Sequence, residues 1–172
     1  MATLQQDYKT FLSRKSHSAG MGGFRPTSLP GVLMDFQAAL VDWAVRKGRA
    51  AIFADCGLGK SVMELVWADN VVRHTNKPVL LLTPLAVGRQ MAREAERFGI
   101  DAVRSADGTL PGSPRVVVTN YERLHLFDAG GFGGVVCDES SILKNYGGAT
   151  RKQVTRFLAK MPYRLLATAT AS

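Results

Sequence analysis

The feature that most constrains this chain is a glycine-rich turn that follows the apolar run 50–53. The turn reads Ala54-Asp55-Cys56-Gly57-Leu58-Gly59-Lys60-Ser61 and leads into a stretch with helical periodicity. Glycines let successive backbone N–H groups curl around an anion, and a helix that begins at the turn adds its positive N-terminal end. A strand, a glycine turn and a helix in this order are typical of a phosphate-binding loop.

The residue types at the end of the turn fit this interpretation. Lys60 is placed to reach the β- and γ-phosphates of a nucleotide, and the Ser61 hydroxyl to ligate Mg²⁺. The remaining phosphate contacts are expected from Cys56, Gly57, Leu58 and Gly59. The general pattern opens with glycine, whereas this chain has Ala54, and the plain alternative is a glycine turn that merely precedes a helix.

A second motif supports the first. The segment Gly134-Val135-Val136-Cys137-Asp138-Glu139 is a short apolar strand that ends in two adjacent carboxylates. Asp138 is expected to hold Mg²⁺ and Glu139 to polarise the attacking water as general base. Taken alone, such a pair is usually a solvated strand end.

Composition sets the limits of the fold. The chain has 172 residues, enough for one domain with a full core, and a net charge of +8, which favours a polyanionic partner such as nucleic acid. There is no apolar run of membrane-spanning length and no signal peptide, so an intracellular, cytoplasmic protein is expected. Cys56 and Cys137 are interpreted as small reduced packing residues, not as a disulfide.

Strand and helix patterns alternate along most of the chain. Strands are expected at 50–54, 78–83, 101–104, 115–119, 134–138 and 163–168, and helices at 2–16, 33–47, 60–74, 85–98 and 149–160. This alternation predicts parallel β-α-β units, and continuously apolar strands indicate helices on both faces. The fold class is therefore α/β, a single doubly wound domain with a mostly parallel sheet.

Two further details concern the N-terminal part. Residues 1–31 are expected to form a helix and an irregular segment that could wrap over the first strand, and residues 32–172 to form the nucleotide-binding domain. The periodicity of 33–47 predicts a buried side made of Phe36, Leu40, Trp43 and Ala44.

With these motifs in order, residues 24 to 170 resemble the first RecA-like motor domain of superfamily 2 helicases. The resemblance is greatest to SWI/SNF-like translocases and to DEAD/DEAH-type helicases of bacteriophages. In that family a loop that opens with alanine is common. The resemblance implies a RecA-like fold, ATP and Mg²⁺ as cofactors, nucleic acid as a partner (DNA more than RNA), and a bacterial or phage-infected cell as the location.

The resemblance also implies roles for single residues. Gln37 lies where the family places an adenine-reading glutamine, whose amide offers both a donor and an acceptor. Without the family, Gln37 would be read as a surface residue. Phe24 or the segment 26–29 is a candidate for stacking on the base.

The nucleic-acid contacts implied by the family lie at strand ends. Thr83 and Pro84 resemble motif Ia, Thr119 and Asn120 resemble motif Ib, and in the family both loops hold a strand by its phosphates. The alternative is that each threonine simply caps a helix. Lys144, with Asn145, matches the Lys-Asn pair of SWI/SNF-like enzymes.

The segment 166–170 resembles motif III, so Thr168 and Thr170 are expected to couple the γ-phosphate site to the nucleic-acid track. One departure from the family lies at Ser140-Ser141, where the DEAH form has Ala-His, so histidine-mediated coupling is not expected.

Two basic stripes at helical spacing remain. Arg89, Arg93 and Arg97 form one, and the second consists of Lys152, Arg156 and Lys160. Such stripes are usually solvated helix faces, and nucleic-acid contact is the alternative.

The family's motor has a second RecA-like domain, which this chain does not contain. The leading hypothesis is therefore the ATP-binding half of a nucleic-acid-dependent ATPase, a helicase or translocase that hydrolyses ATP slowly by itself. The alternatives are a kinase-like phosphotransferase, and a non-catalytic nucleic-acid-binding module with nucleotide as a structural ligand.

Overall fold

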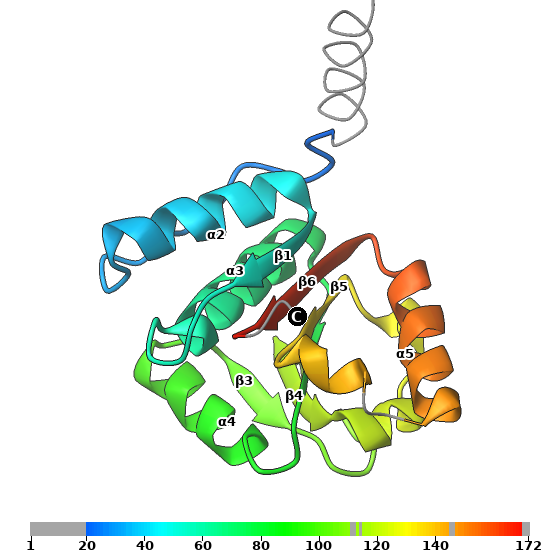
Figure 1. Ribbon diagram of the computed structural model, residues 1–172. Coiled ribbons are helices and arrows are strands. Elements are labelled where there is room, and N and C mark those ends of the chain that lie inside the picture. Colours follow the sequence, from blue (N-terminus) through cyan, green and yellow to red (C-terminus); the bar gives the residue numbers. More distant parts are fainter. Residues whose placement is uncertain (1–19, 111–112, 114, 145–146, 170–172) are drawn as a thin grey trace, which may run out of the picture.

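The computed structural model describes residues 20–110, 113, 115–144 and 147–169 of the chain (Figure 1). The helix expected at 2–16 lies outside these residues, and so do Asn145 and Thr170. None of the described helices is both long enough and apolar enough to cross a membrane.

The centre of the molecule is one six-stranded sheet with the order β1-β6-β5-β2-β4-β3 (Figure 1). Every pairing in it is parallel, as the alternation of strands and helices predicts. The strands are β1 (Arg49–Phe53), β2 (Val79–Thr83), β3 (Ala102–Arg104), β4 (Val116–Asn120), β5 (Gly134–Cys137) and β6 (Tyr163–Thr168).

Helices cover both faces of the sheet, which confirms the predicted α/β architecture (Figure 1). One face carries α2 (Asp35–Lys47), α3 (Lys60–Thr75) and α4 (Gly88–Arg97). The other carries α5 (Gly148–Lys160) and the short 3₁₀ helices η1 (Tyr121–Leu126) and η2 (Ala129–Gly131). A third 3₁₀ helix, η3 (Ser140–Lys144), follows β5. These 3₁₀ helices are too short to show a helical period in the sequence.

The two faces of the sheet have separate hydrophobic cores because side chains alternate along each strand. In β2, for example, Leu81 packs toward α3 and Leu80 packs toward η1 and α5. All five residues of β2 are buried, as the apolar run predicts. Ten residues of α3 are buried as well, so this helix is held firmly behind the phosphate loop.

The face that α2 buries differs from the prediction. Its buried residues are Gln37, Val41, Ala44 and Val45, while Phe36 is 42% and Trp43 41% exposed. Small and β-branched residues let α2 approach α3 and β1 closely, and Gln37 finds its hydrogen-bond partners on that side. The aromatic stripe therefore points outward, although periodicity alone favours burying the largest side chains.

The irregular segment that precedes α2 packs against helices rather than over β1. The N–H of Phe24 donates to the Val45 carbonyl at the end of α2. The buried Asn70 of α3 accepts from the N–H groups of Thr27 and Ser28 and donates to the Ser28 carbonyl. This segment is tied to two helices by hydrogen bonds that no sequence periodicity reveals.

The stacking role considered for Phe24 is wrong. Its ring stacks on His74, with centroids 3.8 Å apart, and meets Tyr163 edge-on. His74 lies in the last turn of α3, about 21 Å along the helix from Lys60 at 1.5 Å per residue. Phe24 therefore anchors the N-terminal segment at the end of the sheet that lies opposite the phosphate loop.

Candidate functional site

The strand order brings the predicted motifs together at one edge of the sheet. The loop 54–59 leaves the carboxyl end of β1, Thr168 ends the neighbouring β6, and Asp138 follows β5, the next strand. The N–H of Ala54 donates to the Thr168 carbonyl at 3.1 Å, and the N–H of Asp138 donates to the Leu82 carbonyl at 2.8 Å. Ligands of open α/β sheets bind outside this edge.

The loop has the backbone that a phosphate cradle requires. Gly57 and Gly59 have φ angles of 86° and 72°, in the left-handed region that favours glycine. Gly59 also has no room for a side chain, since a Cβ there would overlap Nε2 of Gln37. The 16-residue α3 begins at the next residue, so its free N–H groups point into the loop.

Lys60 lies inside the curl of the loop and among the acidic groups of the site. Its Nζ donates to the Ala54 carbonyl at 3.1 Å. Its positive charge opposes the rise that burial causes in the pKa of the Glu64 and Asp138 carboxyls, and it adds to the lowering of the Glu139 pKa by hydrogen bonds. The lysine therefore lies between the loop backbone and the acidic strand end, as its predicted role requires.

Gln37 lies behind the loop and is only 4% exposed. Its Nε2 donates to the Leu58 carbonyl at 2.9 Å, and its Oε1 accepts from the N–H of Met34 at 3.0 Å. The side chain thus joins the start of α2 to the phosphate loop, and each polar atom keeps one further hydrogen bond available. A role toward adenine remains a proposal.

Asp138 is fixed at the end of β5. Its carbonyl accepts a 2.6 Å hydrogen bond from the hydroxyl of the buried Tyr121. Burial, and then the charge of Glu139, raises the pKa of Asp138 to about 6. At neutral pH the carboxylate is still mainly ionised, the form that a metal ligand needs.

Glu64 is an acidic residue that the sequence reading missed. It lies on α3, one turn beyond Lys60, and its side chain is fully buried. Among the described residues, the neighbouring Asp138 carboxyl is the one group recorded as a hydrogen-bond partner of this carboxyl. Burial and then the charge of Asp138 raise the pKa of Glu64 well above its usual range. In the sequence it interrupts the apolar run 62–68, where one charged residue usually marks a solvent-facing side.

Glu139 links the strand end to β6. Its Oε1 accepts from the Ser141 hydroxyl at 2.6 Å and from the Thr168 hydroxyl at 2.8 Å. The hydrogen bond from the Ser141 hydroxyl lowers the pKa of Glu139 most. The hydrogen bond from the Thr168 hydroxyl and the charge of Lys60 lower it further. The backbone of Glu139 has a φ of 48°, a left-handed conformation that is uncommon outside glycine and occurs often at functional sites.

These bonds bear on two sequence expectations. The hydroxyl of Thr168 lies against a candidate catalytic carboxylate, as expected of a residue that senses the phosphate site. Ser141, which stands where related motifs have histidine, joins the same carboxylate. Glu139 therefore joins this strand end to β6 through two hydroxyls, and the coupling role of Thr168 stays a prediction.

The two cysteines are free, as expected, but only one packs in the core. Cys137 is buried in β5, and burial raises the pKa of its thiol to about 12. Cys56 is exposed in the phosphate loop, so its interpretation as a packing residue is wrong. Residues 55–58 of this loop are all exposed, so Cys56 has no core to join.

The other half of the same edge carries a small basic hollow at the ends of β2, β4 and β3. Eight residues line it: Pro84, Leu85, Gly88, Arg104, Ser105, Thr119, Asn120 and Arg123. Ser105 Oγ, Thr119 Oγ1 and Asn120 Oδ1 are buried there, and no described group hydrogen-bonds to them. Buried polar atoms are normally satisfied, so these three point to a polar ligand.

This hollow places three of the predicted nucleic-acid residues together, namely Pro84, Thr119 and Asn120. Thr83 lies differently, because it is fully buried and its hydroxyl donates to the Pro84 carbonyl at 2.7 Å. Neither threonine caps a helix, since the N-caps of α4 and η1 are Val87 and Asn120. Lys144 lies apart, exposed at the end of η3.

The sequence reading missed three members of this hollow: Arg104, Ser105 and Arg123. Arg104 and Ser105 stand at the end of the short β3, and Arg123 lies on η1. Each of them lies at or just beyond the end of a predicted strand, and ligands of parallel sheets bind beyond the carboxyl ends of the strands. This rule could have identified them from the sequence.

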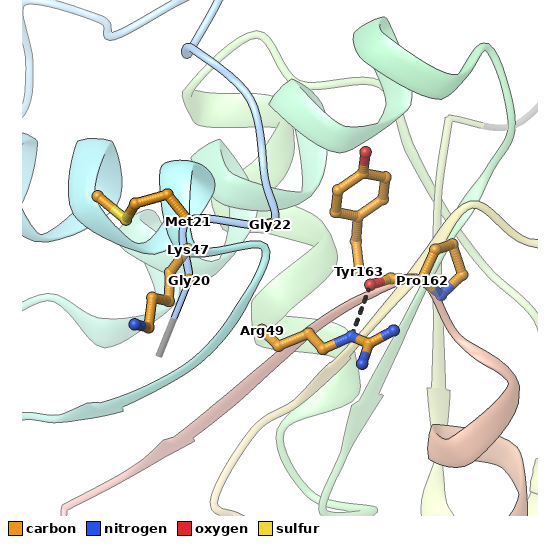
Figure 2. Close-up of a pocket in the computed structure, with 7 residues that line it drawn as sticks. All are labelled: Gly20, Met21, Gly22, Lys47, Arg49, Pro162 and Tyr163. Atoms are coloured by element: carbon orange, nitrogen blue, oxygen red, sulfur yellow. Dashed lines mark hydrogen bonds between the residues drawn. The ribbon is translucent and has the colours of Figure 1, made fainter. Parts of the chain in front are cut away.

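A larger hollow of about 640 Å³ lies at the opposite edge of the sheet (Figure 2). Its lining includes Lys47, Arg49 and Tyr163, and Arg49 Nε donates to the Pro162 carbonyl at 3.2 Å. It lies at the amino ends of β1 and β6, whereas ligands of such sheets bind at the carboxyl ends. Size alone therefore does not identify the site.

Comparison with solved structures finds the same fold in other proteins. The SWI2/SNF2 ATPase core of Sulfolobus solfataricus in complex with dsDNA superimposes with a TM-score of 0.70 and 21% identity, over 86% of this chain. The UvsW helicase from bacteriophage T4 gives a TM-score of 0.68 and 14% identity, over 87% of this chain. This chain shares its RecA-like α/β fold with these two proteins.

The RecA-like domain described here corresponds to part of those proteins. It spans 34% of the Sulfolobus chain and 57% of the phage chain. The Sulfolobus core domain in another structure gives a TM-score of 0.66 and 19% identity, over 84% of this chain and 32% of its own. Comparison of the sequence with protein-family models and with curated proteins finds no match.

Proposed function

We propose that this domain is the ATP-binding half of a nucleic-acid-dependent ATPase of the helicase or translocase type. The observation that carries the proposal is the division of one sheet edge into two adjoining parts. The phosphate loop, Asp138 and Glu139 occupy the β1-β6-β5 part, and a basic hollow occupies the β2-β4-β3 part. Two solved structures with this fold are named as a SWI2/SNF2 ATPase core and a helicase.

The residues present fit Mg²⁺ and a nucleoside triphosphate. The glycine backbone at 57 and 59 and the start of α3 supply N–H groups for phosphate oxygens, and Lys60 supplies the charge. Ser61 and Asp138 are suitable Mg²⁺ ligands, since this ion is usually held by one or two side chains and by the phosphates. When bound, Mg²⁺ neutralises charge that develops on the transferred phosphoryl group.

Activation of the attacking water and its link to β6 are assigned to Glu139, which follows β5, and to Thr168 at the end of β6. Glu139 is the proposed general base, which orients a water and accepts its proton, and its bonds from Ser141 and Thr168 support this role by favouring the ionised form. Because Thr168 donates to the same carboxylate oxygen, a shift of Glu139 toward the water changes its bond to β6. That bond is the candidate link between the phosphate site and the rest of the edge.

Nucleic acid is the proposed partner of the basic hollow, with DNA favoured over RNA. Arg104 and Arg123 supply charge, and the hydroxyls of Ser105 and Thr119 supply donors for a backbone phosphate. A second RecA-like domain is the other proposed partner. The apolar side chains of Phe53, Leu58 and Leu85 are 63%, 42% and 63% exposed around the site, as expected of a surface that a further domain covers.

The test replaces the lysine of the loop and measures the two ligands separately. In Lys60→Ala, calorimetric affinity for ATP with Mg²⁺ falls by about tenfold or more, because a charge-assisted contact to phosphate is lost. Binding of nucleotide-free protein to DNA is unchanged. Lys77→Ala, which removes an exposed lysine beyond the other end of α3, is the matched control and binds both ligands normally.

Two results would contradict the proposal. One is wild-type protein that gives no heat with ATP at any concentration. The other is a Lys60→Ala variant that binds ATP as tightly as the wild type. Nucleotide binding that has no effect on DNA affinity would favour a non-catalytic module.

A further inference from the structure

The helix α5 has a charge pattern that the nucleotide site and the strand-end hollow do not use. Its 13 residues include four cations, Arg151, Lys152, Arg156 and Lys160, and no carboxylate. All four are exposed, and none of them forms an ion pair among the described residues. By contrast, the arginines of α4 share their helix with Glu94 and Glu96.

The four cations lie on one face of α5. The exposed positions are 151, 152, 155, 156, 159 and 160, whereas Val154 and Phe157 are buried against η1 and η2. The exposed residues between the cations are Thr155 and Ala159, which are small. A hollow over this face is lined by Gly148, Thr155 and three of the cations, Arg151, Lys152 and Arg156. Small residues flanked by long cations let a polyanion approach the helix closely.

This face is continuous with the hollow at the strand ends. Arg123 of η1 lines the strand-end hollow, and the next two residues, Leu124 and His125, line a second hollow between η1 and α5. Arg156 and Lys160 border that second hollow, and Arg156 also borders the hollow over α5. Two carboxylates accompany this path, Asp128 in the lining of the second hollow and the exposed Glu122 beside Arg123. Figure 1 shows α5 beside the sheet, on the side opposite α3 and α4.

We infer that the basic face of α5 is a second contact surface for the backbone of duplex nucleic acid. The inference rests on the proposed function, since the duplex that lies on the strand-end hollow continues around η1 onto α5. From Arg151 to Lys160 the helix rises about 14 Å, a length over which a duplex carries about eight phosphates. The contact is sequence-independent, because lysine and arginine on an exposed helix face bind phosphates and not base edges.

The experiment compares two variants with the same net charge. In the first, Arg151→Gln, Lys152→Gln and Arg156→Gln remove one lysine and two arginines from α5. In the matched control, Lys77→Gln, Arg93→Gln and Arg97→Gln remove the same residue types from exposed positions that line none of these three hollows. All six positions lie outside the core, so both variants are expected to fold, which melting curves verify.

Fluorescence anisotropy with a short labelled DNA duplex is measured between about 50 and 200 mM salt. The α5 variant is expected to bind about tenfold or more weakly at low salt, with a slope of log K against log salt that is less negative by about 2 to 3. The control is expected to change the slope by less than about 1. Single-stranded DNA is expected to respond less than the duplex, because fewer of its phosphates reach α5.

Three results would overturn the inference. An α5 variant with the wild-type slope and affinity would remove α5 from the duplex surface while leaving the proposed function intact. An α5 variant that binds DNA normally but loses polyglutamate would assign the face to an acidic protein partner. Wild-type protein that binds neither DNA nor RNA would contradict the nucleic-acid part of the proposed function as well.

Discussion

At the scale of single residues, the site consists of one lysine among three carboxyls with different surroundings. Glu64 is fully buried, Asp138 is nearly buried, and Glu139 is partly exposed and held by two hydroxyls. The pKa of the first two is raised by burial, and the pKa of Glu139 is lowered by its hydrogen bonds. Environments that separate the pKa values of neighbouring acids are typical of catalytic sites.

A prediction at this scale concerns Glu64. Because its pKa is raised in the folded protein, the unfolded chain releases this proton first as the pH rises, and stability is lost above about pH 4.3. Glu64→Gln is neutral at every pH and avoids this loss. The melting temperature of Glu64→Gln is therefore expected to fall less than that of the wild type between about pH 5 and pH 8.

The control for this prediction is Glu96→Gln, which changes an exposed glutamate on α4. It should reproduce the pH dependence of the wild type. Asp138 interacts with Glu64, so the difference between the wild type and Glu64→Gln reports the titration of the pair of carboxyls. Parallel melting curves for the wild type and Glu64→Gln across this pH range would show that the buried carboxyl does not ionise with a raised pKa.

At the scale of elements, the segment before α2 depends on one side chain of α3. Asn70 is fully buried and bonds Thr27, Ser28 and the Val66 carbonyl. This segment leads into α2, whose Gln37 bonds the Leu58 carbonyl of the loop. An amide in the middle of a helix thus holds the segment that leads to part of the site.

The prediction at this scale is that Asn70→Ala lowers the free energy of unfolding by about 2 kcal/mol or more, because several backbone groups lose their partner. Urea titration measures this loss. The neighbouring Asp69→Ala removes only an exposed ion pair with Arg73 and should cost about 1 kcal/mol or less. Equal effects for the two variants would mean that the segment is held by other contacts.

At the scale of the whole molecule, the phosphate loop and the carboxylates face outward from one edge of a single domain. The exposed apolar side chains around that edge, such as Phe53 and Leu85, leave it open to a partner. Phosphoryl transfer in related folds gains about 10³ to 10⁵ in rate from an arginine supplied by a second element. A domain without such an arginine binds the nucleotide but leaves transition-state charge uncompensated.

We therefore expect this chain alone to release phosphate from ATP at a near-background rate, with little stimulation by DNA. Addition of a second RecA-like domain in trans should raise the rate, and a mixture made with Lys60→Ala should stay at background. A continuous phosphate-release assay measures all three cases. Brisk DNA-stimulated turnover by the isolated chain would show that the charge is compensated from within this domain.

The sequence by itself determined the strands, the loop and the acidic strand end, because these depend on local patterns. Apolar runs of strand length, a glycine turn before Lys60 and a carboxylate pair after β5 are short-range signals. They predict an α/β fold with a phosphate site at one edge, and the strand order then confirms that the motifs meet. The sequence could not predict which face of α2 is buried, since that depends on how closely α2 packs against α3 and β1.

Only the tertiary structure decided which distant residues share a site. Glu64 is one charged residue within an apolar run of sequence, and only the packing of α3 behind β5 places it beside Asp138. Ser141 and Thr168 are brought together only by their shared partner Glu139. The same holds for Arg104, Ser105 and Arg123, which belong to one hollow because β3 and β4 are neighbours. The physical reason is that parallel strands bring their carboxyl ends together regardless of their separation along the chain.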